Sequence, residues 1–165
     1  MAALVAMALA ICGVLPLRIR LRMASVTTII SQASARPPVF FGTLHTGSAS
    51  DAVDRIVQVF PADAQTQIRL QLSMTLEAVL TQQLVPKKNG GRVLACEFMI
   101  VTDAIRNMIR AGNTPQIANA IATSASIGGM TMDQSLVKLV RTGVIAKDVA
   151  LHYSHERDYV QKNAM

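Results

Sequence analysis

The sequence predicts an α/β fold in which a short α/β core is followed by a subdomain of helices. Apolar residues make up 51% of the 165 residues but aromatic residues only 4%, so aliphatic side chains and nine Met must fill the core. Such a core suits helices and buried strands better than a β-sandwich. Strand-like and helix-like patterns alternate over residues 39–101, and only helix-like patterns follow. Two Cys indicate a reducing compartment rather than a disulfide framework.

The charge pattern argues against a nucleic-acid partner. The net charge is +6, but residues 1–36 hold four Arg and no acid, which leaves only +2 for residues 37–165. A basic patch interleaved with aromatic residues, as a single-strand binder needs, is absent from the sequence. We therefore expect no binding of nucleic acid.

Residues 1–38 differ in composition from the rest and form a separate apolar and basic extension with a linker. Residues 1–17 carry no charged side chain and precede a basic stretch, residues 18–22. One interpretation is a single N-terminal membrane anchor whose basic flank stays in the cytoplasm. The other is an unstructured segment or a short apolar helix. Residues 23–38, rich in Ser and Thr and ending in Pro37-Pro38, resemble a linker.

The core begins with a predicted strand and a predicted helix. Val39–Leu44 is a short apolar run, typical of a strand buried on both faces. Ser48 and Asp51 form a helix start signal, and Pro61 ends the helix. Apolar residues recur at i, i+3, i+4 and i+7 between them, at Val53, Ile56, Val57 and Phe60.

A longer helix and a pair of strands are predicted next. The helix starts at Asp63, and its apolar face comprises Ile68, Leu72, Leu76, Val79 and Leu80. The strands Leu80–Pro86 and Arg92–Val101 flank Lys87–Gly91, whose Asn-Gly pair predicts a tight turn. Glu97 is the lone acid in its strand. A structural partner for it is favoured over a catalytic role.

The remaining residues predict a series of helices, several of which have start and stop signals of their own. Thr102 or Asp103 begins a helix that ends at Gly112. Thr131 and Gln134 form a capping box, and Gly143 ends the helix that follows. Residues 147–163 predict one or two short, more polar helices.

No complete catalytic or metal site follows from the residues. The stretch from Gly42 to Ala49 has the glycine spacing of a phosphate loop, but Ser48 stands at the lysine position and Ala49 at the magnesium-binding hydroxyl. It therefore cannot act as a working Walker A loop. His152 and His155 lack acidic or thiol partners in pattern, so a surface pair is favoured and no metal is expected.

A series of motifs nevertheless resembles one family. Thr43–Ala49 and the following Asp54-Arg55-Ile56 are similar to the His box and next helix of type IV pilus retraction ATPases, the PilT-type, twitching-motility branch of the secretion ATPases. Ala104–Arg110 is very similar to the Ala-Ile-Arg-Asn-Leu-Ile-Arg signature of that branch, and Thr131–Leu136 also matches. The resemblance runs from residue 39 to about residue 155.

This resemblance implies a RecA-like P-loop ATPase core over residues 39–101 and a C-terminal helical subdomain over residues 102–165. It implies ATP and Mg as cofactors of the intact family, neither of which we expect to bind this chain tightly. It also implies assembly into a hexameric ring and coupling of hydrolysis to pilus disassembly. Carried over, His45, with Thr43 and Thr46, senses the γ-phosphate. The residues that couple the motor to its partner are Ala104, Ile105, Arg106, Asn107, Ile109 and Arg110.

Two functions stay open on the sequence alone. The first is the C-terminal half of a retraction ATPase, located at the cytoplasmic side of the inner membrane. We expect it to be inactive by itself, because no Walker A or Walker B segment precedes the His box. The second is a non-catalytic interaction protein that docks on the pilus inner-membrane platform or on an intact ATPase hexamer, with an anchor in residues 1–17. Since a RecA-like sheet is parallel, we further expect an open edge at Val39–Leu44, with Pro37 and Pro38 hindering its pairing.

Overall fold

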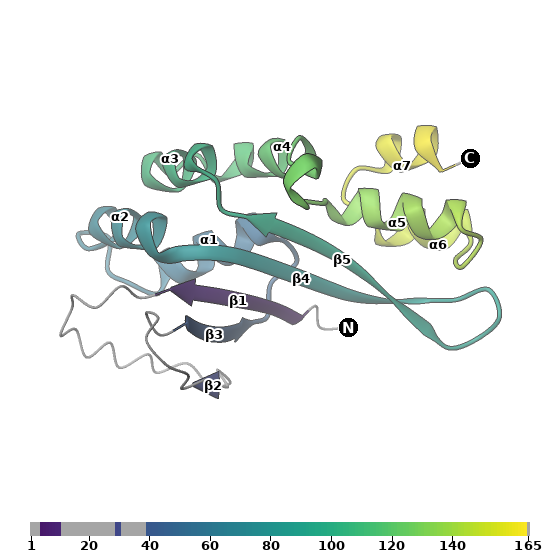
Figure 1. The fold of residues 1–165 in the computed structure, drawn as a ribbon, viewed down its shortest axis with the longest axis horizontal. Helices are drawn as coiled ribbons and strands as arrows, with labels where there is room; N and C mark the ends of the chain where they lie inside the picture. The colour runs from purple at the N-terminus through teal and green to yellow at the C-terminus, as the bar shows by residue number, and fades with distance from the viewer. Residues whose placement is uncertain (1–3, 11–28, 31–38, 165) are drawn as a thin grey trace.

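The computed structural model describes residues 4–10, 29–30 and 39–164 and confirms the α/β fold class. Its centre is a five-stranded sheet with the order β2-β3-β1-β4-β5 (Figure 1). The strands are β1 (Leu4–Ala10), β2 (Ile29–Ile30), β3 (Val39–Leu44), β4 (Leu76–Pro86) and β5 (Arg92–Ile100).

The strand β1 corrects two expectations about the sheet. It lies between β3 and β4 and pairs antiparallel with both, so that Met7 faces Gly42 on one side and Val79 on the other. The described sheet is therefore antiparallel in every ladder, and β3 has no open edge, since β2 also pairs with it. The inserted strand β1 precedes Pro37 and Pro38 in the chain, so the two prolines at the start of β3 do not hinder the pairing as expected.

The segment Leu4–Ala10 is accordingly a strand, not the unstructured extension or short apolar helix expected for the N-terminal residues. Within the described residues, no helix is long and apolar enough to cross a membrane. In the predicted linker, Ile29–Ile30 form the strand β2. The other residues of the proposed anchor and of the linker lie outside the described part.

Helices follow β3 and β5 in chain order. Between β3 and β4 lie α1 (Ala49–Gln58) and α2 (Gln65–Thr75). After β5 come α3 (Asp103–Ala111), η1 (Thr114–Gln116), α4 (Ile117–Ala122), η2 (Ala125–Ile127), α5 (Met132–Arg141), α6 (Lys147–Tyr153) and α7 (Arg157–Asn163). Three start or stop signals hold: Ser48 caps α1, Gly112 ends α3 with φ +73°, and Thr131 and Gln134 form the capping box of α5.

The boundary between α2 and β4 differs from the sequence prediction. The helix ends at Thr75, and Leu76, Val79 and Leu80 belong to the strand. Leu76 and Val79 are fully buried, as they would be in a buried helix or in a buried strand. Their apolar character alone therefore does not distinguish a helix from a strand. Pairing with β1 and β5 stabilises the strand conformation of these residues, because it provides hydrogen-bond partners for their backbone on both sides.

The strands β4 and β5 form the predicted hairpin, with positive φ at Gly90 and Gly91 in its turn. Two hydrophobic clusters pack on one face of this hairpin. The first joins its inner half, at Val79 and Met99, to α1–α4. The second joins its outer half, at Val85 and Ala95, to α5–α7. Figure 1 shows these helices arranged in a row along the hairpin.

Candidate functional site

The loop from His45 to Ser48, which joins β3 to α1, holds the candidate site. The Ser48 hydroxyl accepts a 3.1 Å hydrogen bond from the Asp51 amide and so caps α1. The Thr46 hydroxyl donates to the Ser48 carbonyl at 3.4 Å. These local contacts fix the path of the loop, and His45 remains exposed at its start.

A long-range contact holds the same loop from inside the protein. Glu97 on β5 is only 5% exposed, and its Oε1 accepts a 2.7 Å hydrogen bond from the Ala49 amide at the start of α1. A carboxylate at a helix N-terminus is also favoured by the helix dipole. This confirms the structural interpretation of Glu97. It also means that the first amide of α1 is already occupied by a carboxylate of the chain itself.

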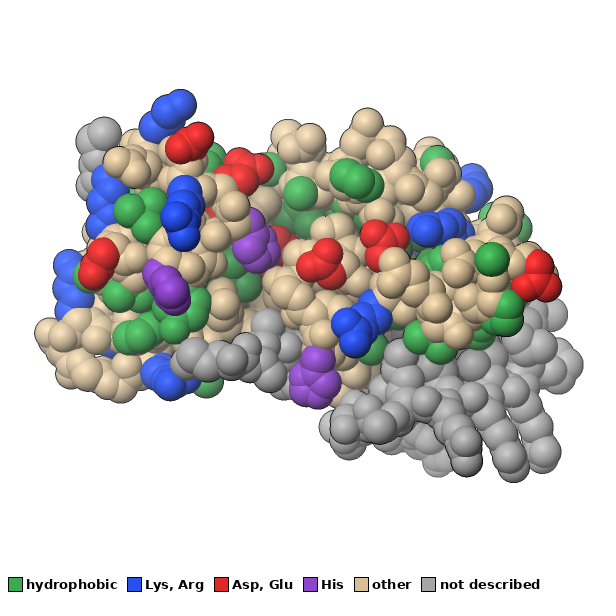
Figure 2. Space-filling model, turned by 180° about the vertical axis from the view of Figure 1, so that it is seen from behind, with side chains coloured by type: hydrophobic (Ala, Val, Ile, Leu, Met, Phe, Trp, Pro, Cys, Tyr) green, Lys and Arg blue, Asp and Glu red, His purple; other side chains and the backbone are tan. Residues whose placement is uncertain are grey.

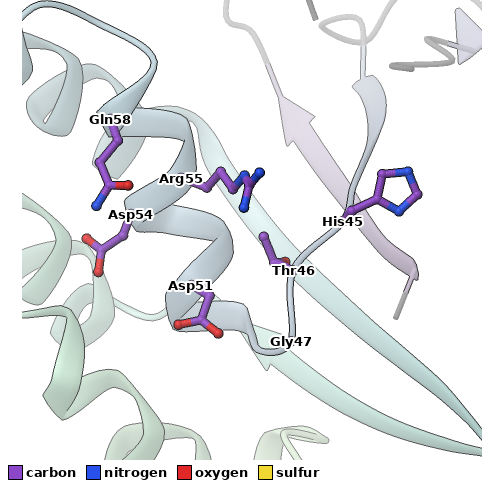
Figure 3. Close-up of a pocket in the computed structure, with 7 residues that line it drawn as sticks. All are labelled: His45, Thr46, Gly47, Asp51, Asp54, Arg55 and Gln58. Carbon is purple, nitrogen blue, oxygen red and sulfur yellow. The ribbon is translucent and has the colours of Figure 1, made fainter. Parts of the chain in front are cut away.

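An open pocket of about 370 Å³ lies beside this loop. It is lined by the loop and by the polar face of α1, at His45, Thr46, Gly47, Asp51, Asp54, Arg55 and Gln58. Figure 3 shows Arg55 extending from α1 toward the side of the loop that carries His45. Thr43, the third residue assigned to the His box, lies in β3 and does not line the pocket.

The charged residues of the pocket differ in their contacts with the rest of the chain. Asp54 accepts a 2.7 Å hydrogen bond from the Thr114 hydroxyl and lies 3.5 Å from Arg69 Nη1, so it joins α1 to η1 and α2. His45, Asp51 and Arg55 are exposed. An exposed imidazole and a guanidinium beside a capped loop can contact phosphate oxygens. Among the described residues, no group of three His, Cys, Asp or Glu could hold a metal ion.

Sequence reasoning assigned the His box but missed the contribution of α1. Asp51, Asp54, Arg55 and Gln58 follow Gly47 at spacings of three and four residues, opposite the apolar residues of the same helix. An amphipathic helix that begins directly after a candidate loop turns its polar face toward that loop. This periodicity was the available signal.

The residues assigned to partner coupling lie on α3, and none of them lines the pocket. Ile105 and Ile109 are buried in the first cluster, whereas Ala104, Asn107 and Arg110 are exposed. The Arg110 guanidinium donates to the Asn107 side chain at 3.4 Å.

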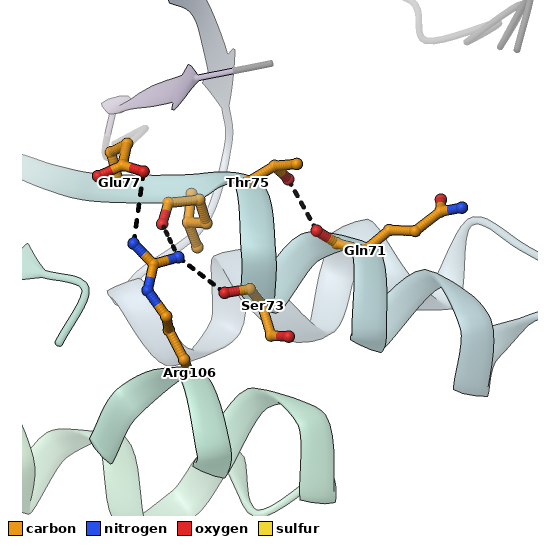
Figure 4. A network of polar contacts seen from close by, with 6 residues as sticks. Gln71, Ser73, Thr75, Glu77 and Arg106 are labelled. Atoms are coloured by element: carbon orange, nitrogen blue, oxygen red, sulfur yellow. Dashed lines mark hydrogen bonds and ion pairs between the residues drawn. The ribbon is translucent and has the colours of Figure 1, made fainter. Parts of the chain in front are cut away.

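Arg106 has a structural position that the sequence did not reveal. Its Nη1 donates to the carbonyls of Ser73 at 2.8 Å and Leu76 at 3.2 Å, and its Nη2 lies 3.4 Å from Glu77 (Figure 4). It therefore satisfies carbonyls at the C-terminal end of α2, where an arginine also complements the helix dipole. This residue holds α3 to the junction of α2 and β4.

His152 lies in α6, which ends at Tyr153, and His155 lies just beyond it; both side chains are exposed. The backbone amides of His155 and Glu156 both donate to the carboxylate of Asp133, each at 2.9 Å. Asp133 is buried in the first turn of α5 and so fixes the connection between α6 and α7.

Comparisons with known proteins place these features in context. Over 110 residues, or 67% of its length, the chain is 47% identical to the type IV pilus retraction ATPase PilT of Pseudomonas aeruginosa. It is also 47% identical over 111 residues to a twitching motility protein of Neisseria gonorrhoeae. The chain spans only about a third of either relative, 32% and 30%. No family model matches the chain.

Solved structures support the same relationship. The crystal structure of the pilus retraction motor PilT with bound ADP matches 72% of this chain with a TM-score of 0.64 and 38% identity, although the match covers 33% of that chain. The ATPase DotB of Legionella pneumophila matches with a TM-score of 0.54 at 20% identity, which supports the fold alone.

The fold thus matches part of the ATPase fold seen in PilT and DotB. More particularly, about two thirds of the chain corresponds to part of a PilT-type retraction ATPase, as the motifs in Thr43–Ala49 and Ala104–Arg110 indicate.

Proposed function

We propose that residues 39–164 form part of the motor of a type IV pilus retraction ATPase, in which His45 senses the γ-phosphate of ATP. The observation that carries this proposal is the loop at the end of β3. Ser48 and Glu97 fix it from both sides, and it presents an exposed His45 next to Arg55. Within an assembled ring, these two side chains would face a phosphate bound with Mg by other parts of the motor. The ring is a hexamer at the cytoplasmic side of the inner membrane, in contact with the pilus platform.

We further propose that this chain alone neither binds ATP tightly nor hydrolyses it. Phosphoryl transfer requires positioned phosphates and a metal ion. The pocket offers an imidazole and a guanidinium, while Glu97 already occupies the first amide of α1. Purified chain should show no ATP turnover in the presence of Mg. Turnover that His45→Ala abolishes, and that Arg110→Ala leaves unchanged, would contradict this proposal.

A second candidate function is docking without catalysis, on an intact ATPase hexamer. The exposed face of α3, formed by Ala104, Asn107 and Arg110, favours it, because three side chains of one signature helix are left without a buried role. Overproducing the chain should then impair twitching in a cell with an intact motor. The paired change Asn107→Ala and Arg110→Ala should relieve that inhibition. If soluble wild-type chain has no effect on twitching, this second function fails.

A further inference from the structure

The outer end of the β4–β5 hairpin exposes apolar side chains. We define the hairpin tip as residues 84–94. Leu84 is 53% exposed and Leu94 44% exposed, and the two residues lie directly opposite each other in the ladder. Their neighbours Val85 and Ala95 are fully buried against α5–α7 on the other face of the hairpin. The leucine pair therefore points away from all the helices that pack on this hairpin.

Three cations accompany this leucine pair. Lys87, Lys88 and Arg92 are exposed, and no acid occurs in the sequence between Glu77 and Glu97. Neither of the two ion pairs found among the described residues involves these cations. In Figure 2, Lys and Arg side chains gather at the left-hand end, which is the end occupied by the hairpin turn.

The remaining charges at this end nearly cancel. The helices α5–α7 with their flanking residues contribute five cations against four acids, an excess of only one positive charge: Lys138, Arg141, Lys147, Arg157 and Lys162 against Asp133, Asp148, Glu156 and Asp158. The excess of positive charge there therefore comes largely from the hairpin tip.

The turn that presents these side chains is held in place by the backbone. The Lys87 amide donates to the Gly91 carbonyl at 3.1 Å, and the Lys88 amide donates to the Val144 carbonyl, also at 3.1 Å. The second bond ties the turn to the loop between α5 and α6. A turn fixed in this way loses little backbone entropy when its side chains bind a surface.

We propose that the hairpin tip binds the anionic surface of a phospholipid bilayer. Leu84 and Leu94 enter the interfacial region, while Lys87, Lys88 and Arg92 lie among lipid phosphates. The hairpin projects beyond the helices beside it in Figure 1, which suits contact with a broad surface. No aromatic side chain occurs in the tip to stack on a base, which disfavours nucleic acid as the occupant. This proposal goes beyond the proposed function and does not depend on nucleotide binding.

The test is co-sedimentation of the full chain with vesicles. One set contains phosphatidylcholine with phosphatidylglycerol, and the other phosphatidylcholine alone. We expect binding to the anionic vesicles only, weakened by salt. The triple change Lys87→Ser, Lys88→Ser and Arg92→Ser should reduce it by about a hundredfold, since each basic residue contributes roughly a factor of five. The pair Leu84→Ser and Leu94→Ser should also reduce it. A control with the same loss of charge outside the hairpin tip (Lys138→Ser, Arg157→Ser, Lys162→Ser) should keep most of the binding, because these exposed cations lie on α5 and α7.

Several results would overturn the proposal. Equal binding of the wild type and the triple variant would do so, as would equal binding to neutral vesicles. Loss of binding only after Arg18→Ser, Arg20→Ser and Arg22→Ser would assign the lipid contact to the N-terminal residues. An effect of the tip variants on self-association or on binding of single-stranded DNA, with vesicle binding unchanged, would assign another partner. Since the three cations are exposed, the triple variant should fold, which its circular dichroism melt checks.

Discussion

Glu97 and Ala49 are joined by a 2.7 Å hydrogen bond from the amide at the start of α1 to a buried carboxylate on β5. Through this bond the interior of the hairpin controls where the His45 loop ends and α1 begins. The bond thus connects the loop that begins at His45 with β5, although the two segments are far apart in the sequence.

Replacing Glu97 should destabilise the protein. Glu97→Ala leaves the Ala49 amide buried without its acceptor and should lower the free energy of unfolding by about 2 kcal/mol. Urea unfolding followed by circular dichroism measures this change. Glu156→Ala, at an exposed position, should cost less than about 0.5 kcal/mol. Equal costs for the two variants would contradict a special role for the buried carboxylate.

Arg106 and Arg110 should separate folding from docking. Arg106→Ala removes the donor to the carbonyls of Ser73 and Leu76 and should cost about 1.5–3 kcal/mol of stability. Arg110→Ala, on the exposed face of the same helix, should cost less than about 0.5 kcal/mol. Thermal melts of both variants measure these two losses of stability. If Arg106→Ala melts like the wild type, its contacts to the end of α2 are not important for stability.

Asp133 should be essential for the packing of α6 and α7. Asp133→Ala removes the acceptor of two backbone hydrogen bonds, from His155 and Glu156, and should cost about 2–3 kcal/mol. Hydrogen exchange should increase most in residues 147–163. Asp63→Ala serves as the control, because Asp63 is exposed. Uniformly increased exchange throughout the chain would argue against a local role.

A proline in β1 should destabilise the sheet more than a change of side chain alone, because it removes a backbone amide. Met7 is paired with Gly42 and with Val79, so Met7→Pro interrupts the sheet at its central strand. We expect aggregation or a clearly lowered melting temperature, since two strand edges become open. Met7→Ala keeps the amide and is the control. A soluble Met7→Pro variant with a wild-type melt would show that this strand is dispensable.

Local signals accounted for much of the fold. The caps at Ser48 and Thr131, the stop at Gly112 and the turn before Arg92 depend on residues close in sequence, and each lies where the sequence predicted it. Such features need only the side-chain chemistry of one turn. This is why they could be read without knowing the rest of the chain.

Features set by distant partners could not be read in this way. The insertion of β1 between β3 and β4 depends on two ladders with remote segments, and apolar residues alone do not reveal the partner of a strand. The same holds for Leu76, whose place in a strand is decided by its neighbours in the sheet. For Arg106, the motif predicted an important residue, while its contacts to α2 depend on how α3 packs.

The position of β1 also has a consequence for synthesis on the ribosome. Leu4 pairs with Gln82, so β1 cannot complete its ladder with β4 until the chain has been translated past β4. Until then the edge of β1 that pairs with β4 remains open, although its other edge can pair with β3 earlier, whereas the β4–β5 hairpin closes as soon as it emerges. An unpaired strand edge favours aggregation, which competes with a pairing that is delayed in this way. The rate at which ribosomes cross codons 11–82 should therefore influence the yield of folded protein.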